Sequence, residues 1–398
     1  MAANQTMFTD EELIKVRSDT PGLSSRIHLD NCGSSLMPQS VVDVMSNYLE
    51  SEIRLGGYVA QEQQSAQLSA VYLSLATLFG GSREDYALTS GAVDAWSKAF
   101  YSIPLTSADN IVTMYNEYCS NYVACIQRAK HEGVEIRVAR ASEDGSLDIE
   151  HLSELVDENT KIVSITHVAS SSGQIANLAA IKAITQKVGA FYILDACQSV
   201  GQLPVNFVDI GCDIATATSR KFLRGPRGIG FLYINKASRE RLEPAMLTNQ
   251  SAAWTGDNEY KLVEDASMFE MWERSCLNQV GFGAALEYLT KLGVDKATAQ
   301  TQCNAQSLRK AIYGINDIEP ACQYDASAAI ITFNKDGWLA HDVRTAMEKL
   351  GIAVQVSSVF HTRLDLGARA IDSAVRVSPH YYNDQSEFDR FLNALDDL

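Results

Sequence analysis

The chain contains an apolar run that ends in an acid and a glutamine, Ile193-Leu194-Asp195-Ala196-Cys197-Gln198-Ser199-Val200-Gly201. A second short strand, 214–217, leads into Thr218-Ser219-Arg220-Lys221, and a glycine-rich turn follows, Gly225-Pro226-Arg227-Gly228. Other apolar runs alternate with amphipathic stretches from about residue 86 to residue 234, which is typical of a mostly parallel sheet covered by helices. Ligands of such sheets bind at the carboxyl ends of the strands, where the acid and the lysine both lie.

An acid and a lysine in this arrangement are what a protein needs to hold pyridoxal phosphate. Lys221 would form an imine with the cofactor's aldehyde, and Asp195 would pair with the pyridine nitrogen. An opposite charge in hydrogen-bonding reach keeps that nitrogen protonated, so the ring stays an electron sink. Gln198 is placed to donate to the phenolic oxygen of the ring. A lysine after a strand is usually only solvent-exposed, but its pairing with Asp195 favours the cofactor.

The sequence also predicts a site for the cofactor's phosphate. Gly91, Ala92 and Val93 lie between a predicted strand, 86–89, and a predicted helix, 94–102, so their backbone N–H groups can bind an anion. Such a junction is a weak signal alone. Thr218 and Arg220 add a hydroxyl and a cation just before the lysine. Together these residues predict a phosphate cup.

Two further residues are candidates for contacts with cofactor and substrate. Tyr118 follows a predicted strand, 111–114, and its ring could either stack on the cofactor or pack as an ordinary loop aromatic. Arg376 is embedded in the apolar run Val375-Arg376-Val377. A buried arginine needs an anionic partner, either an acid of the protein or the α-carboxylate of an amino-acid substrate. A cofactor site nearby favours the substrate carboxylate.

Length and composition bound the remaining possibilities. The 398 residues exceed the size of one hydrophobic core, so two domains are expected. A net charge of −16 disfavours nucleic acid and anionic membranes as partners. No apolar run is long enough to span a membrane, and residues 1–19 lack a secretory pattern, which predicts a cytoplasmic protein. The eight cysteines and seven histidines show no metal-binding spacing, so no metal is expected.

These observations predict an α/β fold with a seven-stranded, mostly parallel sheet in a large cofactor-binding domain, residues 26–284. A smaller α+β domain, residues 285–398, follows it. Residues 1–25 form an N-terminal segment that we expect to pack with the small domain. The predicted strands of the sheet are 86–89, 111–114, 134–138, 162–166, 191–195, 214–217 and 230–234.

In their order and spacing, these motifs resemble the class V aminotransferase family, the fold-type I pyridoxal phosphate enzymes that include cysteine desulfurases. The resemblance runs from His28-Leu29-Asp30-Asn31 to the last helix. It implies a homodimer with shared active sites and places Ser170 beside the cofactor ring. Val93 falls where many members have a phosphate-binding threonine, and Tyr118 falls where desulfurases have a stacking histidine.

Within the family, the chain resembles the hercynylcysteine sulfoxide lyases of ergothioneine biosynthesis. The phrases that carry this resemblance are Leu29-Asp30-Asn31-Cys32-Gly33-Ser34-Ser35, Gly56-Gly57-Tyr58-Val59-Ala60, Asn116-Glu117-Tyr118-Cys119-Ser120-Asn121, Arg220-Lys221-Phe222-Leu223-Arg224-Gly225-Pro226-Arg227-Gly228, Phe269-Glu270-Met271-Trp272-Glu273 and Val375-Arg376-Val377-Ser378-Pro379-His380-Tyr381-Tyr382-Asn383. By position, they add Asn31, Cys32, Tyr58 and Trp272 as candidate substrate-binding residues.

The function predicted on this basis is a carbon–sulfur β-lyase. It would cleave a cysteine S-conjugate, or its sulfoxide, to pyruvate, ammonia and a sulfur product. Lys221 would move the Cα proton, and Cys119 or Tyr58 would protonate the leaving group. An aminotransferase or an epimerase, with Tyr118 and Cys119 as candidate second bases, stays open. A cysteine desulfurase is ranked lower because residues 356–373, where desulfurases carry their nucleophile, contain no cysteine.

Overall fold

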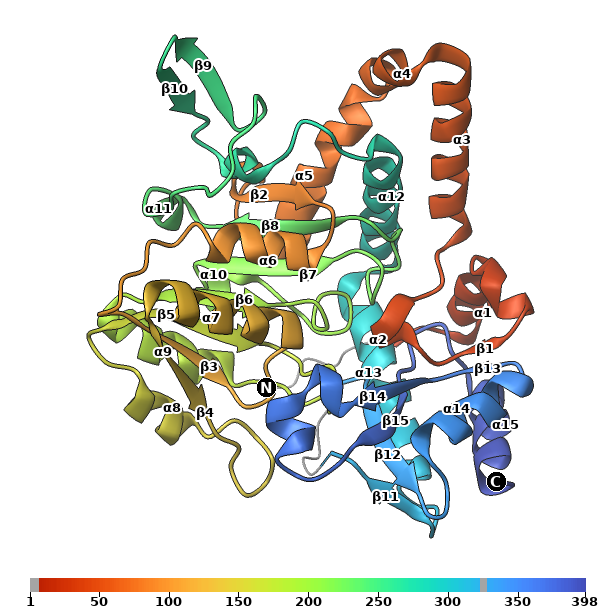
Figure 1. Cartoon of the computed structure of the whole chain (residues 1–398). Helices are drawn as coiled ribbons and strands as arrows, with labels where there is room; N and C mark the ends of the chain where they lie inside the picture. Colours follow the sequence, from red (N-terminus) through yellow and green to blue (C-terminus); the bar gives the residue numbers. More distant parts are fainter. Residues whose placement is uncertain (1–6, 323–327) are drawn as a thin grey trace.

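A seven-stranded sheet forms the centre of the molecule in the computed structural model, which describes residues 7–322 and 328–398 (Figure 1). The strand order is β2-β8-β7-β6-β5-β3-β4. The five adjacent strands β7, β6, β5, β3 and β4 run parallel to one another, whereas β8 runs antiparallel to both β7 and β2. The strands are β2 (Tyr86–Thr89), β3 (Asn110–Met114), β4 (Glu135–Ala139), β5 (Thr160–Thr166), β6 (Phe191–Asp195), β7 (Ile214–Thr218) and β8 (Gly230–Ile234).

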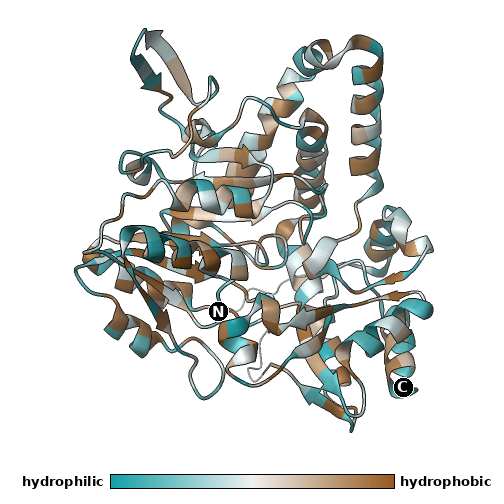
Figure 2. Ribbon diagram, viewed as in Figure 1, coloured by the Kyte–Doolittle hydropathy of each residue, from teal (hydrophilic) through white to brown (hydrophobic). Residues whose placement is uncertain are grey.

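Helices cover both faces of this sheet because its central strands are apolar on both sides. Alternate residues of β6 face opposite ways: Tyr192 and Leu194 join one core, and Phe191 and Ile193 join the other. Hydrophobic residues follow the strands and the helix faces turned toward them (Figure 2). The first core includes residues of α5 (Ser65–Phe79), α9 (Leu178–Val188) and α12 (Cys276–Leu292); the second includes residues of α6 (Ala92–Phe100) and α7 (Cys119–Glu132).

A four-stranded antiparallel sheet, in the order β11-β12-β15-β14, forms the core of the C-terminal part. The N-terminal part of the chain contacts this region, since β1 pairs with β13 and Arg17 bonds to Glu387 at 2.9 Å. The elements are β1 (Ile27–His28), β11 (Ile318–Pro320), β12 (Ile331–Lys335), β13 (Ile352–Ala353), β14 (Gln355–Ser358), β15 (Ser373–Val377), α1 (Asp10–Ser18), α13 (Val294–Ile312), α14 (Ala340–Lys349) and α15 (Gln385–Asp396).

Two projections extend from the side of the large sheet that carries β2 (Figure 1). One is a helical arm of α3 (Gln39–Leu55) and α4 (Gly57–Gln63), and the other is a hairpin of β9 (Ala252–Gly256) and β10 (Glu259–Leu262). The short helices are α2 (Asn31–Ser34), α8 (Ile149–Leu155), α10 (Phe207–Ile210) and α11 (Lys236–Arg239). None of the helices in the described ranges has the length and apolarity required to cross a bilayer.

The predicted α/β class and the seven strands of the large sheet are confirmed, with strand ends that differ by at most two residues. The pattern did not predict the helical arm or the β9–β10 hairpin. Both are largely solvent-exposed in the single chain, so neither shows the buried apolar runs on which the prediction relied.

Candidate active site

The carboxyl ends of β5, β6 and β7 surround a cavity of about 320 Å³. Ten predicted site residues line it: Gly91, Ala92, Val93, Tyr118, Ser170, Asp195, Gln198, Thr218, Arg220 and Lys221. The topology explains this convergence, because parallel strands deliver their carboxyl ends to one edge of the sheet.

Lys221 is the reactive amine of this cavity. Its side chain is 9 % exposed and makes no hydrogen bond or ion pair with any described residue. Burial lowers the pKa of the ammonium group below its usual value. A buried lysine without a partner is costly unless it reacts as a neutral amine, so Lys221 fits covalent attachment to an aldehyde.

Asp195 and Gln198 both line the cavity, and each can form further hydrogen bonds. Asp195 Oδ1 accepts from the backbone N–H of Cys197 at 2.9 Å, and Oδ2 accepts from Asn121 Nδ2 at 3.1 Å. Gln198 donates through Nε2 to the carbonyl of Cys32 at 3.1 Å, whereas its Oε1 is buried without a partner. Asp195 provides an acid for the pyridine nitrogen. The unpartnered Oε1 of Gln198 can only accept, so a donation to the phenolic oxygen would have to come from the second hydrogen of Nε2.

The N-terminus of α6 and the turn after Lys221 also line the cavity. Gly230 brings these segments together, since a Cβ there would lie 2.8 Å from the carbonyl carbon of Gly91 and 3.0 Å from the Ala92 nitrogen. Thr218, Arg220 and Arg227 line the cavity too, and Arg220 Nη1 donates to the Gly33 carbonyl. Helix N–H groups, a hydroxyl and two guanidinium groups suit a phosphate.

Arg376 approaches the cavity through Ser170. Its Nη1 donates to the Ser170 carbonyl at 3.3 Å, and Nη2 lies 3.5 Å from Asp30 Oδ1. Its Nε is buried and has no hydrogen-bond partner among residues 7–322 and 328–398. Both Nη contacts of the guanidinium are long, so an incoming carboxylate can compete for these donors.

Five other predicted residues lie outside the cavity lining. Asn31 and Cys32 are buried behind it, and the Asn31 amide is used by the Ser378 carbonyl at 2.7 Å and by the Tyr382 hydroxyl. Cys119 begins α7 beside Tyr118. Tyr58 is 79 % exposed, Trp272 is 55 % exposed, and both line a different surface cavity. Roles for these five in this single chain stay predictions.

The sequence reasoning missed several residues of the lining: Asn116, Asn121, Thr166, Cys197 and Arg227. A signal for Thr166 was available, because it ends β5 next to Asp195 in the sheet. Asn116 and Asn121 flank Tyr118 in a motif that had been noticed only as a family phrase. Their role depends on how the start of α7 sits over the sheet, and no local pattern reports that.

Comparison with known proteins supports and corrects this interpretation. The profile of the aminotransferase class-V family matches residues 27–391. A protein named "Probable cysteine desulfurase" from Methanothermobacter thermautotrophicus is 27% identical, with 96% of this chain and 97% of that protein covered. The apo structure of cysteine desulfurase from Thermococcus onnurineus NA1 covers 98% of both chains at a TM-score of 0.90 and 22% identity.

The cofactor prediction is confirmed. A C-DES mutant with glycine covalently linked to its pyridoxal phosphate covers 96% of this chain and 99% of its own, with a TM-score of 0.86 at 19% identity. This fold, the family and the buried Lys221–Asp195 pair agree on pyridoxal phosphate.

The predicted function was wrong in its subfamily. Full-length relatives carry the name cysteine desulfurase, which the sequence interpretation ranked below a sulfoxide lyase, and nothing supports the hercynylcysteine sulfoxide lyase branch. The error came from giving the cysteine-free segment 356–373 more weight than the similarity of the whole chain. With its family profile, its fold and its lysine-containing cavity in agreement, the chain belongs to the aminotransferase class-V family of pyridoxal phosphate enzymes.

Proposed function

We propose that this protein removes the sulfur atom from cysteine and releases alanine. The observation that carries the proposal is the similarity, over nearly the whole chain, to proteins named cysteine desulfurase. The cavity supports it, because Lys221, Asp195 and the nearby Arg376 suit an α-amino acid.

The residues of the chain have separate tasks in this reaction. Arg376 binds the substrate carboxylate with its guanidinium group, whose contacts with Ser170 and Asp30 are long, and orients the Cα–H bond toward Lys221. Lys221, whose pKa is lowered by burial, takes the Cα proton as a neutral amine and returns a proton to the carbon skeleton. Asp195 holds the pyridine nitrogen protonated. The bound cofactor supplies the electron sink for the charge that develops at Cα.

The sulfur leaves to a thiol that is free in solution. Residues 356–373 contain no cysteine, so this segment supplies no acceptor. A thiolate attacks the substrate sulfur, the new S–S bond forms as the Cβ–S bond breaks, and Cβ receives a proton. One cysteine and one thiol then give one alanine and one persulfide, with no external oxidant or reductant.

The test is product analysis with the cofactor-loaded enzyme, L-cysteine and dithiothreitol. We expect alanine and reducible sulfur in equal amounts, and neither product from a Lys221→Ala variant. Pyruvate in place of alanine, or no turnover of cysteine, would refute the proposal.

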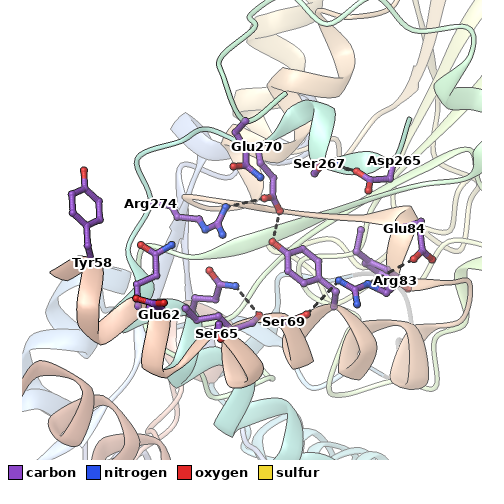
Figure 3. Close-up of a pocket in the computed structure, with 16 residues that line it drawn as sticks. Tyr58, Glu62, Ser65, Ser69, Arg83, Glu84, Asp265, Ser267, Glu270 and Arg274 are labelled. Carbon is purple, nitrogen blue, oxygen red and sulfur yellow. Dashed lines mark hydrogen bonds and ion pairs between the residues drawn. The ribbon is translucent and has the colours of Figure 1, made fainter. Parts of the chain in front are cut away.

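We also propose that two copies of the chain associate through the side that carries α3, α4 and the β9–β10 hairpin (Figure 1). Large apolar side chains are exposed there: Ile53 is 76 %, Tyr58 79 %, Trp254 82 % and Tyr260 62 % exposed. A cavity of about 490 Å³ opens on this side, with Tyr58 at its rim and Glu270 in its wall (Figure 3). Apolar exposure of this extent is typical of a subunit interface.

Glu270 in the wall of that cavity is buried and hydrogen-bonded on both carboxylate oxygens. Glu270 is 2 % exposed, and it accepts from Tyr72 at 2.7 Å and from the Leu88 N–H at 2.8 Å. It also accepts from Arg274 at 3.1 Å (Figure 3). Light scattering during size-exclusion chromatography should give twice the chain mass of 43.6 kDa. A Trp254→Ser, Tyr260→Ser variant should shift toward monomer, and a monomeric wild-type protein at micromolar concentration would contradict this assembly.

A further inference from the structure

Glu117 is a buried carboxyl group that the proposed reaction does not use. It is 3 % exposed and lies between β3, β5 and the start of α7. Its Oε1 accepts from the Thr166 hydroxyl at 2.6 Å, the Tyr118 N–H at 2.8 Å and Asn121 Nδ2 at 3.0 Å. Its Oε2 contacts the hydroxyls of Thr113 and Ser164 at 2.9 and 3.0 Å.

Asn121 connects this carboxyl group to the cofactor site. It is 1 % exposed, and its Nδ2 donates to Glu117 Oε1 and also to Asp195 Oδ2, at 3.0 and 3.1 Å. One NH₂ group therefore joins two carboxyl groups. If the amide were turned over, its oxygen would face two acceptors and lose both bonds.

Glu117 Oε1 is the group that fixes this orientation. Both a carboxylate and a neutral carboxyl group present an acceptor at Oε1, and the Tyr118 N–H and Asn121 NH₂ can only donate to it. The hydroxyls at Oε2 can accept as well as donate, so they accommodate either protonation state. Orientation of the amide thus depends on an acceptor at this position rather than on its charge.

We propose that Glu117 is a positioning residue that acts through Asn121 to hold Asp195 in the geometry and charge state that the pyridine nitrogen needs. A carboxylate that accepts a hydrogen bond is favoured in its charged form. Asp195 accepts from Cys197 N and from Asn121 Nδ2, so the loss of the Asn121 bond weakens its hold on the ring. The inference rests on the cofactor and not on the identity of the substrate.

A small set of titratable groups surrounds the Glu117–Asn121–Asp195 contacts in the described part of the protein. Asp195 and Cys125 interact electrostatically with Glu117, and Lys221, Tyr118 and Cys197 interact with Asp195 or lie beside it. Burial raises the pKa of the Glu117 carboxyl, and burial also raises the pKa of both thiols.

Two substitutions at one position separate orientation from charge. Glu117→Gln keeps an acceptor at Oε1 and places its NH₂ against hydroxyls that can accept, so we expect cofactor affinity within about threefold of wild type. Glu117→Met has no acceptor, and we expect a loss of roughly tenfold or more, because a hydrogen bond to a charged group is lost. The assays are cofactor titration of the apo protein and the pH midpoint of the bound cofactor's visible spectrum.

A second position keeps the proposal testable if Glu117→Met does not fold. Asn121→Leu should show the same weakened affinity and the same shift of the spectral midpoint. Where all variants fold, the double variant should be no worse than either single one, because both act through one contact. Thr113→Val is the matched control, since it removes a contact from the distal oxygen and should change only thermal stability.

Three results would overturn the inference. A wild-type affinity and midpoint in Asn121→Leu would show that Asp195 does not depend on the amide. A defect in Glu117→Gln as large as in Glu117→Met would show that charge, not orientation, matters. Additive losses in the double variant would show two independent structural roles.

Discussion

Gly201 offers a sharp test of how the segment after Asp195 is packed against the segment that carries Lys221. Its φ is +88°, and a Cβ added there would lie 2.5 Å from the Phe222 carbonyl oxygen and 2.6 Å from its carbonyl carbon. These are backbone atoms directly after Lys221, so they cannot move aside as a flexible side chain would. Gly201→Ala should therefore push the lysine away from Asp195.

The expected magnitude follows from two contributions. The positive φ costs an alanine about 1–2 kcal/mol. Overpacking against fixed atoms adds about 1–3 kcal/mol, so the variant should lose about 2–5 kcal/mol of unfolding free energy. Gly293 is the matched control because its φ is +86° and no atom lies within 4 Å of an added Cβ. Gly293→Ala should pay only the first contribution.

The assay is urea unfolding of the cofactor-free proteins, followed by cofactor titration of each. Gly201→Ala should be less stable than Gly293→Ala and should bind the cofactor more weakly, whereas Gly293→Ala should bind it normally. Equal stability of the two variants would refute the reasoning, because the contact with Phe222 would then cost nothing.

Three further predictions concern buried groups. Lys221→Ala should lower alanine formation at least about 100-fold, since the proton-transfer group is lost, and the bound cofactor should lose the absorbance of its lysine-linked form. Burial lowers the pKa of His167 to about 4; the unfolded chain therefore takes up the proton first as the pH falls. His167 thus contributes about 3 kcal/mol of stability that is complete above about pH 6.5 and is lost as the pH falls toward 4. Urea unfolding at several pH values should show that the free energy of unfolding depends less steeply on pH in His167→Gln than in the wild type. Arg224 is 1 % exposed and donates to Leu36 O, Tyr381 and Thr20 at 2.8, 2.9 and 2.6 Å. Arg224→Met should therefore lose about 3 kcal/mol or more of unfolding free energy. The control is the exposed Arg227→Met, whose unfolding free energy should change by less than about 0.5 kcal/mol.

Much of the cofactor site could be predicted from local pattern. Asp195 ends a strand that is apolar at every position before it, and Lys221 follows the next strand by three residues. The parallel-sheet rule then places both at one edge. Nine residues predicted from local pattern line the cavity, as does Ser170, which the family resemblance added. The choice of reaction could not be predicted in the same way, because residues that hold the cofactor are compatible with more than one reaction.

Residues that act through contacts between distant segments were beyond the reach of pattern. The sequence pattern identifies Glu117 only as a polar residue that follows a strand, yet in the structure it is buried among hydroxyls of β3 and β5. Arg376 reads as a buried cation, and only the fold shows that Asp30 is its long-range partner and that its Nε has none.

The sequence by itself determined the α/β class, the strands of the large sheet and the cofactor, since each depends on hydrophobic period or on residues at strand ends. Only the tertiary structure decided which polar groups meet. Asn121 reaches Asp195 from a helix 74 positions earlier in the chain, and Gly201 lies against the backbone of Phe222. Side-chain direction, helix placement and close packing decide such contacts, and these depend on the whole folded core rather than on any local segment.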